Sequence, residues 1–468
     1  MDRVEDLGAR VSALPGTYTP GLGEGQSRRI AVVGGGWAGC AAAHELARAG
    51  QQVLLIEAAA ELGGRARRVE LDLGGQAHVL DNGQHLLIGA YTATAALFAD
   101  LGVALDDVVL RMPFRIEYPD GFHLAAARLP APWHLAVAII GARGLAWSDR
   151  AALAALLPRL RRQHWTVAPD QPAQDWLAQQ RQTPPLVERI WRPLTLAALN
   201  TPLHQASAQA LATVLRDSLG ASAAASDMWL PRADLSALLP HAVERDLAAR
   251  GARILRHCRV DLARRTPRGW SLAVRDGGEH RSEEVDAVVY AAPAAQMQRI
   301  FGLHAAGLQG PLRLIERFRY EPITTVYLKY AAAEQRLPRL MQALLEDASR
   351  RHYGQWVFNR GALDAAQRGV LAVVISTDTH EEPTLESLCA AAAGQLSDVY
   401  GLPAPRAARA IVERRATLAC VPDLERPPQA TALPGLALAG DWTASDYPCT
   451  LEAAVRSGIT AARVVARQ

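Results

Sequence analysis

Three glycines and an acid near the start of the chain have the residue types and spacing that bind a dinucleotide. The apolar run 30–33 leads into G-x-G-x-x-G and a helical pattern, and a second apolar run ends on Glu57. Gly34 permits a tight turn, Gly36 lets the backbone approach a pyrophosphate, and Gly39 lets helix and strand pack closely. The Glu57 carboxylate can accept hydrogen bonds from a ribose. Strand, helix, strand and acid in this order favour a βαβ unit over a plain glycine turn.

A second glycine pair, Gly63-Gly64, is followed by Arg65 just beyond the ribose acid. The first turn of the helix, with Trp37 and Ala38, attracts a pyrophosphate through its N–H groups and its dipole. The backbone N–H groups of Gly63-Gly64 and the Arg65 guanidinium can hold the same pyrophosphate. The alternative is that Arg65 is a solvated surface charge. This extension resembles the FAD-binding signature of the amine oxidase and phytoene desaturase superfamily, and the resemblance implies FAD as the cofactor.

A further group of candidate residues lies near the C-terminus. A buried strand pattern ends at Gly440-Asp441, and a helix is expected to begin near Thr450 or Leu451. Ligands of open α/β sheets bind beyond the carboxyl ends of the strands, so Asp441 is placed to bond a ribityl chain. The helix N-terminus can direct N–H groups at the flavin pyrimidine edge. Alternatively, Thr450 is only a helix cap and Glu452 only a favourable first-turn acid.

Two other segments supply candidates. Residues 80–85 return toward the isoalloxazine in related flavoproteins, so Gln84 and His85 are expected beside the flavin or the substrate. His85 can equally be a surface or supporting residue. Val260, in a strand-like run, is a further cofactor-binding candidate.

These residues are far apart in sequence, so a discontinuous domain must bring them together. The predicted fold class is α/β, a Rossmann-like FAD-binding domain with a mixed α+β substrate domain, amine-oxidase-like. One large α/β domain is possible but separates the strand clusters badly. The predicted segments are 1–27, a flexible lead; 28–110, 230–300 and 416–468, the FAD-binding domain; and 111–229 (mostly helical) and 301–415, the substrate domain.

Composition limits the class of protein. The chain has 468 residues, half of them hydrophobic, and a net charge of +3, which does not favour nucleic acid as a partner. Its five cysteines include no C-x-x-C pair, so we expect neither a metal site nor a disulfide framework, in keeping with a reducing cytoplasm. Residues 1–27 lack the apolar core of a signal peptide, and no run reaches the roughly 18 apolar residues of a membrane span.

One stretch suggests contact with a membrane. Residues 129–140 are apolar and contain Trp133, and Trp147 and the basic run 159–162 follow. Apolar anchors beside cations can lie on an anionic leaflet, here the inner face of the cytoplasmic membrane. An ordinary buried helix followed by a solvated face explains the pattern equally well.

Several internal stretches are more discriminating than the glycine motifs. From Arg29 onward the chain resembles the hydroxysqualene dehydroxylase family of bacterial hopanoid biosynthesis. That resemblance implies an FAD enzyme that converts hydroxysqualene to squalene, and an association with other enzymes of the pathway. The stretches that carry it are 80–87, 117–122, 191–194 with 197–202, 215–219, 231–236, 354–358, 420–422 and 440–448.

The chemistry of this reaction sets requirements for the protein. Departure of an allylic hydroxyl leaves a delocalised cation, which a reduced flavin can quench with hydride from N5. The protein must protonate the leaving oxygen, hold the carbon over N5 and exclude water. The candidate proton donors are His85, Asp446 and Tyr447. A long apolar substrate needs a long apolar tunnel. The candidate wall residues are Trp191, Trp229, Trp356 and Phe358, and the alternative is that each is an ordinary core residue.

Three other functions remain open. A flavin amine oxidase would need an aromatic cage and usually a lysine near the flavin, and Lys329 is the only obvious lysine. A carotenoid-type desaturase or isomerase would run the opposite redox direction on a polyprene. A catalytically silent FAD-binding partner of a prenyl synthase is the third. The sequence contains no second complete G-x-G-x-x-G motif, so it gives no indication of a separate NADPH site.

Overall fold

A parallel sheet of five strands forms the centre of the chain, in a computed structural model that describes residues 27–334, 337–376 and 384–468. The predicted flexible lead over 1–27 lies outside these residues, except for Ser27. Every neighbouring pair in the order β10-β2-β1-β14-β20 is parallel, which confirms the α/β class. The strands are β1 (Arg29–Val33), β2 (Gln52–Ile56), β10 (Arg253–Leu255), β14 (Ala287–Tyr290) and β20 (Leu436–Leu438).

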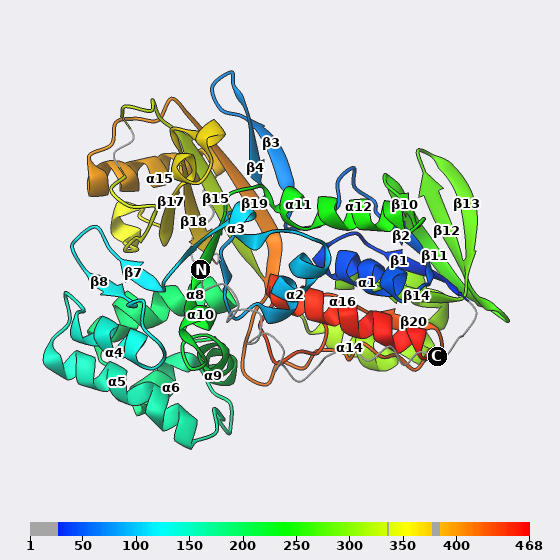
Figure 1. Cartoon of the computed structure of the whole chain (residues 1–468), viewed down its shortest axis with the longest axis horizontal. Helices are drawn as coiled ribbons and strands as arrows, with labels where there is room; N and C mark the ends of the chain where they lie inside the picture. The colour runs from blue at the N-terminus through cyan, green and yellow to red at the C-terminus, as the bar shows by residue number, and fades with distance from the viewer. Residues whose placement is uncertain (1–26, 335–336, 377–383) are drawn as a thin grey trace, which may run out of the picture.

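Two helices that are distant in sequence cover one face of this sheet. Figure 1 shows α1 (Trp37–Arg48) in blue beside α16 (Leu451–Ala466) in red. Small residues on both helices allow the close approach, since a Cβ on Gly458 would lie 2.1 Å from the carbonyl oxygen of Ala38. The packing holds the two candidate helix N-termini on one rigid support.

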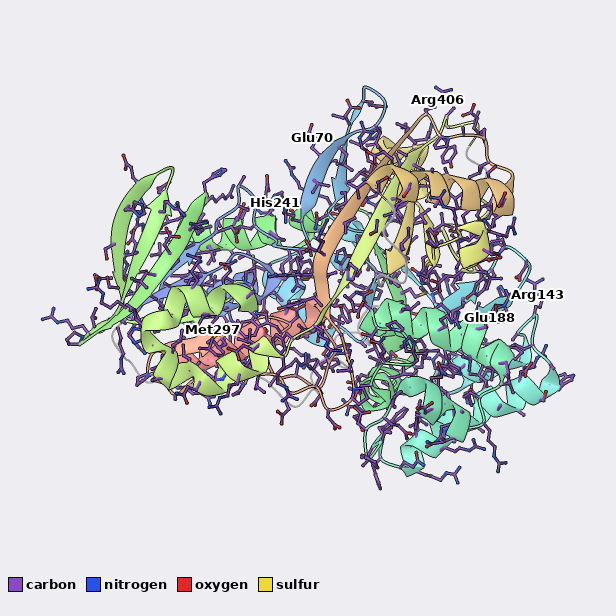
Figure 2. The ribbon with its side chains drawn as sticks, turned by 180° about the vertical axis from the view of Figure 1, so that it is seen from behind. Glu70, Arg143, Glu188, His241, Met297 and Arg406 are labelled. Atoms are coloured by element: carbon purple, nitrogen blue, oxygen red, sulfur yellow. The ribbon has the colours of Figure 1, made fainter. Side chains whose placement is uncertain are left out.

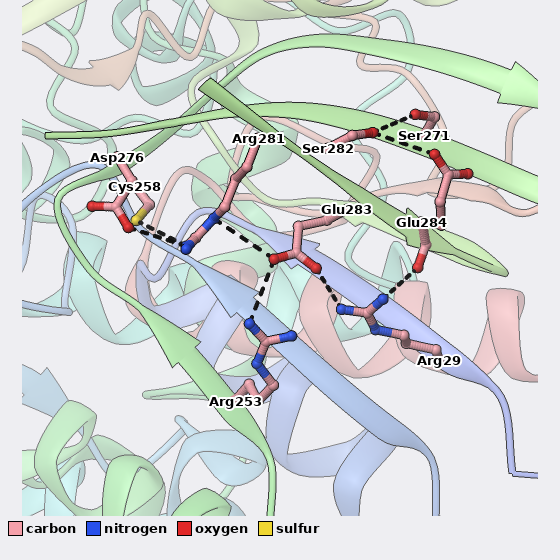
Figure 3. A network of polar contacts seen from close by, with 9 residues as sticks. All are labelled: Arg29, Arg253, Cys258, Ser271, Asp276, Arg281, Ser282, Glu283 and Glu284. Carbon is pink, nitrogen blue, oxygen red and sulfur yellow. Dashed lines mark hydrogen bonds and ion pairs between the residues drawn. The ribbon is translucent and has the colours of Figure 1, made fainter. Parts of the chain in front are cut away.

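A three-stranded antiparallel sheet packs against the other face. It contains β11 (Cys258–Thr266), β12 (Gly269–Asp276) and β13 (Glu279–Val285). Glu283, 7% exposed, ties it to the parallel sheet through Arg29 at 2.5 Å and Arg253 at 3.5 Å (Figure 3).

A second layer is built on a five-stranded antiparallel sheet of order β16-β17-β18-β15-β19, with α15 (Leu385–Tyr400) packed on it. Its strands are β15 (Tyr320–Lys329), β16 (Met341–Ala343), β17 (Trp356–Asn359), β18 (Val370–Ser376) and β19 (Ala407–Leu418). A helical lobe adjoins it, with α4 (Trp133–Ile140), α5 (Trp147–Arg162), α6 (Ala173–Gln179), α7 (Pro184–Leu186), α8 (Arg192–Leu199), α9 (Ala208–Asp217) and α10 (Ala223–Ser226). One apolar core joins this lobe to the sheet.

Short elements connect the two layers. The hairpin of β3 (Arg68–Asp72) and β4 (Ala77–Asp81) delivers residues 82–85 between them. The remaining helices and strands are β5 (Leu87–Ile88), α2 (Thr92–Asp100), α3 (Leu105–Val108), β6 (Val109–Met112), β7 (Arg115–Glu117), β8 (His123–Ala125), β9 (Met228–Pro231), α11 (Leu235–Leu238), α12 (Pro240–Ala249), α13 (Met297–Phe301) and α14 (Gln309–Glu316). Within the described ranges, no helix has both the length and the apolar character that a bilayer crossing requires.

Candidate functional site

The first glycine motif forms the turn between β1 and α1. Gly34 has a φ of +104°, a conformation that favours glycine, and a Cβ on Gly39 would lie 1.8 Å from the Gly34 carbonyl oxygen. Gly36 differs from both, because its φ is −68° and the nearest atom to its added Cβ is the Gly64 Cα at 3.8 Å. Gly34 and Gly39 therefore shape the turn, whereas Gly36 keeps open space beside the helix N-terminus.

The second glycine motif lies directly against the first. The Gly63 N–H donates to the Gly35 carbonyl at 2.8 Å, and the Trp37 indole N–H donates to the Ala66 carbonyl at 3.1 Å. The Trp37 side chain thus fastens the loop to α1, and the backbone of its helical turn faces the glycines.

Glu57 lies at the carboxyl end of β2, beside both loops. Its Oε2 accepts from the Gly35 N–H at 2.6 Å and its Oε1 from the Ala59 N–H at 2.7 Å. The Cys258 N–H donates to the Glu57 carbonyl, which brings the start of β11, and with it Val260, to the same edge of the sheet. Val260 is 2% exposed, and its carbonyl accepts from Arg299 at 3.2 Å.

The C-terminal turn meets the second glycine loop across an ion pair. Arg65 and Asp441 are 2.5 Å apart, although 376 residues separate them in sequence. Gly440 has a φ of +139°, and its N–H donates to the Ser457 hydroxyl at 2.8 Å, which anchors the turn to α16. Arg65 is therefore a partner of the predicted ribityl-binding acid and not an isolated surface charge.

The two helix N-termini differ in how their N–H groups are used. Within the described part of the chain, no side chain caps the first turn of α1, and that turn carries no acid. Its N–H groups are left for an anionic ligand. At α16, which begins at Leu451 as expected, the Thr450 hydroxyl accepts from the Ala453 N–H at 3.2 Å and acts as a cap. These features fit a pyrophosphate at α1.

Glu452 faces another helix. Its carboxylate is fully buried and accepts from the N–H groups of Ala93 and Thr94, both at 2.9 Å, and from the Thr94 hydroxyl at 2.7 Å. Arg456 approaches the same carboxylate at 2.7 Å. Here Glu452 holds the N-terminus of α2 against α16; a contact with the cofactor stays a prediction.

The segment after β4 places Gln84 and His85 between the two layers. The His85 Nδ1 lies 2.8 Å from the Gly83 carbonyl, which can only accept, so Nδ1 carries the proton and Nε2 keeps a lone pair that can accept a hydrogen bond. Burial lowers the pKa of His85, and the hydrogen bond to Gly83 opposes this shift. His85 therefore favours the neutral form.

Gln84 is held by a residue that sequence reasoning missed. Its Oε1 accepts from Arg360 at 3.1 Å, and its amide nitrogen donates to the His85 carbonyl at 2.9 Å. Arg360 is 1% exposed, and its Nε donates to Gln367 at 2.7 Å. No local pattern could have indicated this contact, which joins residues 276 positions apart.

Asp81 was also missed, although it lies within the segment 80–85 that supplied Gln84 and His85 as candidates. Its carboxyl group is 2% exposed and accepts from the Leu235 N–H at 2.8 Å. Burial raises the pKa of Asp81 to about 7, against the opposing effect of Arg360. A buried acid that titrates near neutrality, four residues from His85, is a further candidate for moving a proton.

The other two candidate proton donors lie in a different environment. The Tyr447 hydroxyl donates to the Asp217 carboxylate, and Arg456 stacks 5.0 Å from its ring. Burial, with Asp217 adding to it, raises the pKa of Tyr447 to about 12. Asp446 is exposed and faces the charge of Arg216. Across the described residues, no hydrogen bond or ion pair joins this group to His85.

The aromatic wall candidates are all buried. Trp191 donates its indole N–H to Gln182 at 2.9 Å, which is the behaviour of a core residue. Trp356 has no partner for its indole N–H among the described residues and lies on β17 with Phe358. Arg111 stacks 5.4 Å from the ring of Trp229.

Comparisons with known proteins agree with this arrangement. The family model "Flavin containing amine oxidoreductase" matches residues 37–466. A hydroxysqualene dehydroxylase of Rhodopseudomonas palustris is 31% identical, covering 94% of this chain and 98% of that protein, and one of Zymomonas mobilis is 26% identical, covering 92% and 97%. The crystal structure of an oxidoreductase from Methanosarcina mazei superposes with a TM-score of 0.69 at 14% identity, covering 92% and 99%.

Proposed function

The chain belongs to the flavin containing amine oxidoreductase family, and we propose that it is a reductive dehydroxylase that converts hydroxysqualene to squalene with FAD as its cofactor. The end-to-end similarity to the Rhodopseudomonas hydroxysqualene dehydroxylase carries this proposal. Physical association with other enzymes of squalene formation is part of the same proposal.

FAD is supported by the residues that converge at the edge of the parallel sheet. The uncapped turn at Gly36–Gly39, the Gly63-Gly64 loop and the Arg65–Asp441 pair suit a pyrophosphate and a ribityl chain, and Glu57 suits a ribose. When bound in its reduced form, FAD would supply the hydride.

The reaction balances without a further oxidant. The allylic C–O bond breaks, the carbon gains a hydride, the leaving oxygen gains a proton and departs as water, and the two-electron donor is oxidised. The His85 Nε2 can accept a hydrogen bond from the substrate hydroxyl and orient it, because its Nδ1–H is fixed on Gly83. Departure of the oxygen requires a proton, which Asp81 can hold at neutral pH.

The amine oxidase alternative has little support from the side chains. Lys329 is the only lysine of the sequence. Its ammonium donates to the Arg368 carbonyl at 2.8 Å, at the end of β15 where Arg406 also lies. It therefore does not join the residues grouped around Arg65 and His85.

A panel of substrates tests the proposal. The purified holoprotein is photoreduced without oxygen and incubated with hydroxysqualene, and the oxidised holoprotein is incubated with squalene, with polyprenes and, in air, with amines. Squalene formed from hydroxysqualene alone supports a dehydroxylase. Desaturated polyprenes, or peroxide from an amine, with hydroxysqualene untouched, would contradict it.

A further inference from the structure

Exposed apolar side chains are concentrated on one small part of the helical lobe. Nine large apolar residues are strongly exposed in the described part of the chain, and five of them fall between positions 129 and 147. Of these five, the most exposed are Trp147 at 73%, Trp133 at 65% and Ile140 at 63%. We name as the α4 face the set Leu129, Trp133, Val137, Ile140 and Trp147. Such a cluster indicates a surface that a partner covers.

The α4 face is a consequence of the helical period. Trp133, Val137 and Ile140 are spaced i, i+4 and i+7 and project from one side of α4, while His134 and Ala138 on the other side are buried. No charged residue occurs in α4, so the helix is apolar all round although it lies at the surface (Figure 1). A helix of this kind is stable when its outer side also meets an apolar phase.

The charge around the α4 face has one sign. The sequence between Asp120 and Asp170 contains six arginines and one acid, Asp149. Asp149 is buried, and its oxygens accept from the Ala146 N–H and the Thr183 hydroxyl. The arginines are Arg128, Arg143, Arg150, Arg159, Arg161 and Arg162.

Two of these arginines border the apolar anchors. Arg150 donates to the Ala142 carbonyl at 2.5 Å, beyond the end of α4, and stacks 4.6 Å from the Trp147 ring. Arg143 is exposed and lies at the outer edge of the helical lobe (Figure 2). Apolar tips beside cations match a membrane interface, where tryptophan enters the headgroup region and arginine meets lipid phosphate. A second copy of the same face would instead bring like charges together.

A cavity of about 350 Å³ begins beside this face. Leu129 and His134 contribute to its wall together with Met112 and Ala126. His134 is 1% exposed, and neither ring nitrogen has a hydrogen-bond partner in the described structure. Arg111, Arg128 and Asp227 also line this cavity, so its wall combines apolar and charged side chains with the unpartnered imidazole. Such a wall suits the hydroxyl-bearing end of a long apolar molecule.

We propose that the α4 face docks on an anionic lipid bilayer, and that the adjoining cavity receives the apolar substrate from the membrane. The docking stands independently of the reaction, whereas the role of the cavity rests on the proposed function. Docking at this place would spare a water-insoluble substrate any passage through solvent.

Vesicle sedimentation of the full-length holoprotein tests the docking. Wild type is expected to sediment with phosphatidylcholine–phosphatidylglycerol vesicles and less with phosphatidylcholine alone. The variant Trp133→Ser/Ile140→Ser/Trp147→Ser should bind roughly tenfold more weakly or worse, and Arg128→Ser/Arg143→Ser should lose about fivefold for each arginine. The controls, Leu303→Ser/Leu385→Ser and Arg409→Ser, change other exposed apolar and basic residues away from the α4 face and should bind like wild type.

Three outcomes would overturn the docking: no binding by wild type, equal binding by the face variants, or an equal loss in the controls. If wild type does not bind vesicles but forms a dimer that the triple variant abolishes, the α4 face would be assigned to contact with a second copy.

The cavity is tested separately by turnover of substrate in vesicles and in detergent. Entry from the membrane is supported if the docking variants lose turnover of substrate in vesicles but keep it in detergent. Entry from the membrane is overturned if these variants turn over substrate in vesicles as fast as wild type.

Discussion

At the residue scale, two neighbouring glycines should fail in different ways when substituted. Gly39→Ala places a methyl group on the Gly34 carbonyl and should prevent folding of the turn, whereas Gly36→Ala meets no atom closer than 3.8 Å. We expect Gly36→Ala to fold normally but to bind flavin roughly tenfold more weakly or worse, because the methyl group occupies the pyrophosphate path. Gly310→Ala, which meets no atom within 4 Å, is the control.

The measurements for Gly36→Ala are thermal unfolding of the flavin-free protein and flavin titration. If the variant bound flavin like wild type, the pyrophosphate would not lie between Gly36 and the Gly63-Gly64 loop. If the flavin-free protein were strongly destabilised, Gly36 would have a structural role that its surroundings do not explain.

The three donor candidates from the sequence make a second prediction at this scale. The Tyr447 proton is engaged by Asp217, and Asp446 is exposed. We therefore expect His85→Ala to slow the reoxidation of reduced flavin by hydroxysqualene most, with flavin content unchanged. Tyr447→Phe and Asp446→Asn should change the rate less than tenfold, on the order of one lost hydrogen bond. Rate constants come from anaerobic stopped-flow mixing. An unchanged rate in His85→Ala would remove His85 from the mechanism.

The buried carboxyl group of Asp81 makes a prediction about pH and stability. Its folded pKa of about 7 lies above its ordinary 3.8, so between these values the folded chain binds more protons than the unfolded chain. Stability therefore falls as the pH rises through this window. The amide side chain introduced by Asp81→Asn cannot ionise, so the substitution should raise Tm near pH 8, by about 1 °C per kcal/mol recovered, with little effect near pH 4.

Melting curves between about pH 4 and pH 8 check this prediction. Asp398→Asn is an informative control, because hydrogen bonding from His352 lowers the pKa of Asp398. Replacing this carboxylate should therefore lower Tm near pH 8, whereas Asp81→Asn should raise it. Parallel pH profiles for Asp81→Asn and wild type would mean that Asp81 does not titrate in this window.

At the element scale, Glu452 tests what joins α2 to α16. Glu452→Gln replaces an acceptor that four donors share, so we expect a loss of about 1.5–3 kcal/mol in the flavin-free protein. The measurement is denaturant unfolding, with the exposed Glu279→Gln as control. Unchanged stability with weaker flavin binding would instead make Glu452 a cofactor contact.

The sequence predicted elements well and their contacts poorly. The helix expected to begin near Thr450 or Leu451 was evident from local periodicity and is present as α16. The Gln84–Arg360 hydrogen bond depends on how the β4 loop meets a distant layer. The periodicity of a segment says nothing about which distant residues it contacts, so this hydrogen bond could not be predicted from the sequence.

Motifs with a known mechanism were the exception to this limit. Arg65 and Asp441 were each assigned to the phosphate and ribityl region of one ligand, and the structure places them in contact. Assigning both residues to one ligand therefore predicted that they lie close together, which the sequence around each residue could not indicate. The direct ion pair between them was not predicted.

At the scale of the whole molecule, two layers meet around the segment that carries His85. The parallel sheet carries the two glycine turns, and the antiparallel sheet with its helical lobe supplies Arg360 and the cavity beside α4. Under the proposed function, the first layer would hold the flavin, and the second would admit the apolar substrate and exclude water.

The most direct test of the dehydroxylase account is a single anaerobic turnover. Photoreduced holoprotein is mixed with an equal amount of hydroxysqualene, flavin absorbance is followed, and squalene is quantified by mass spectrometry. The account predicts that each flavin reoxidised yields one squalene and consumes one hydroxysqualene. Flavin that stays reduced while hydroxysqualene is recovered intact, or flavin that reoxidises without squalene, would contradict it.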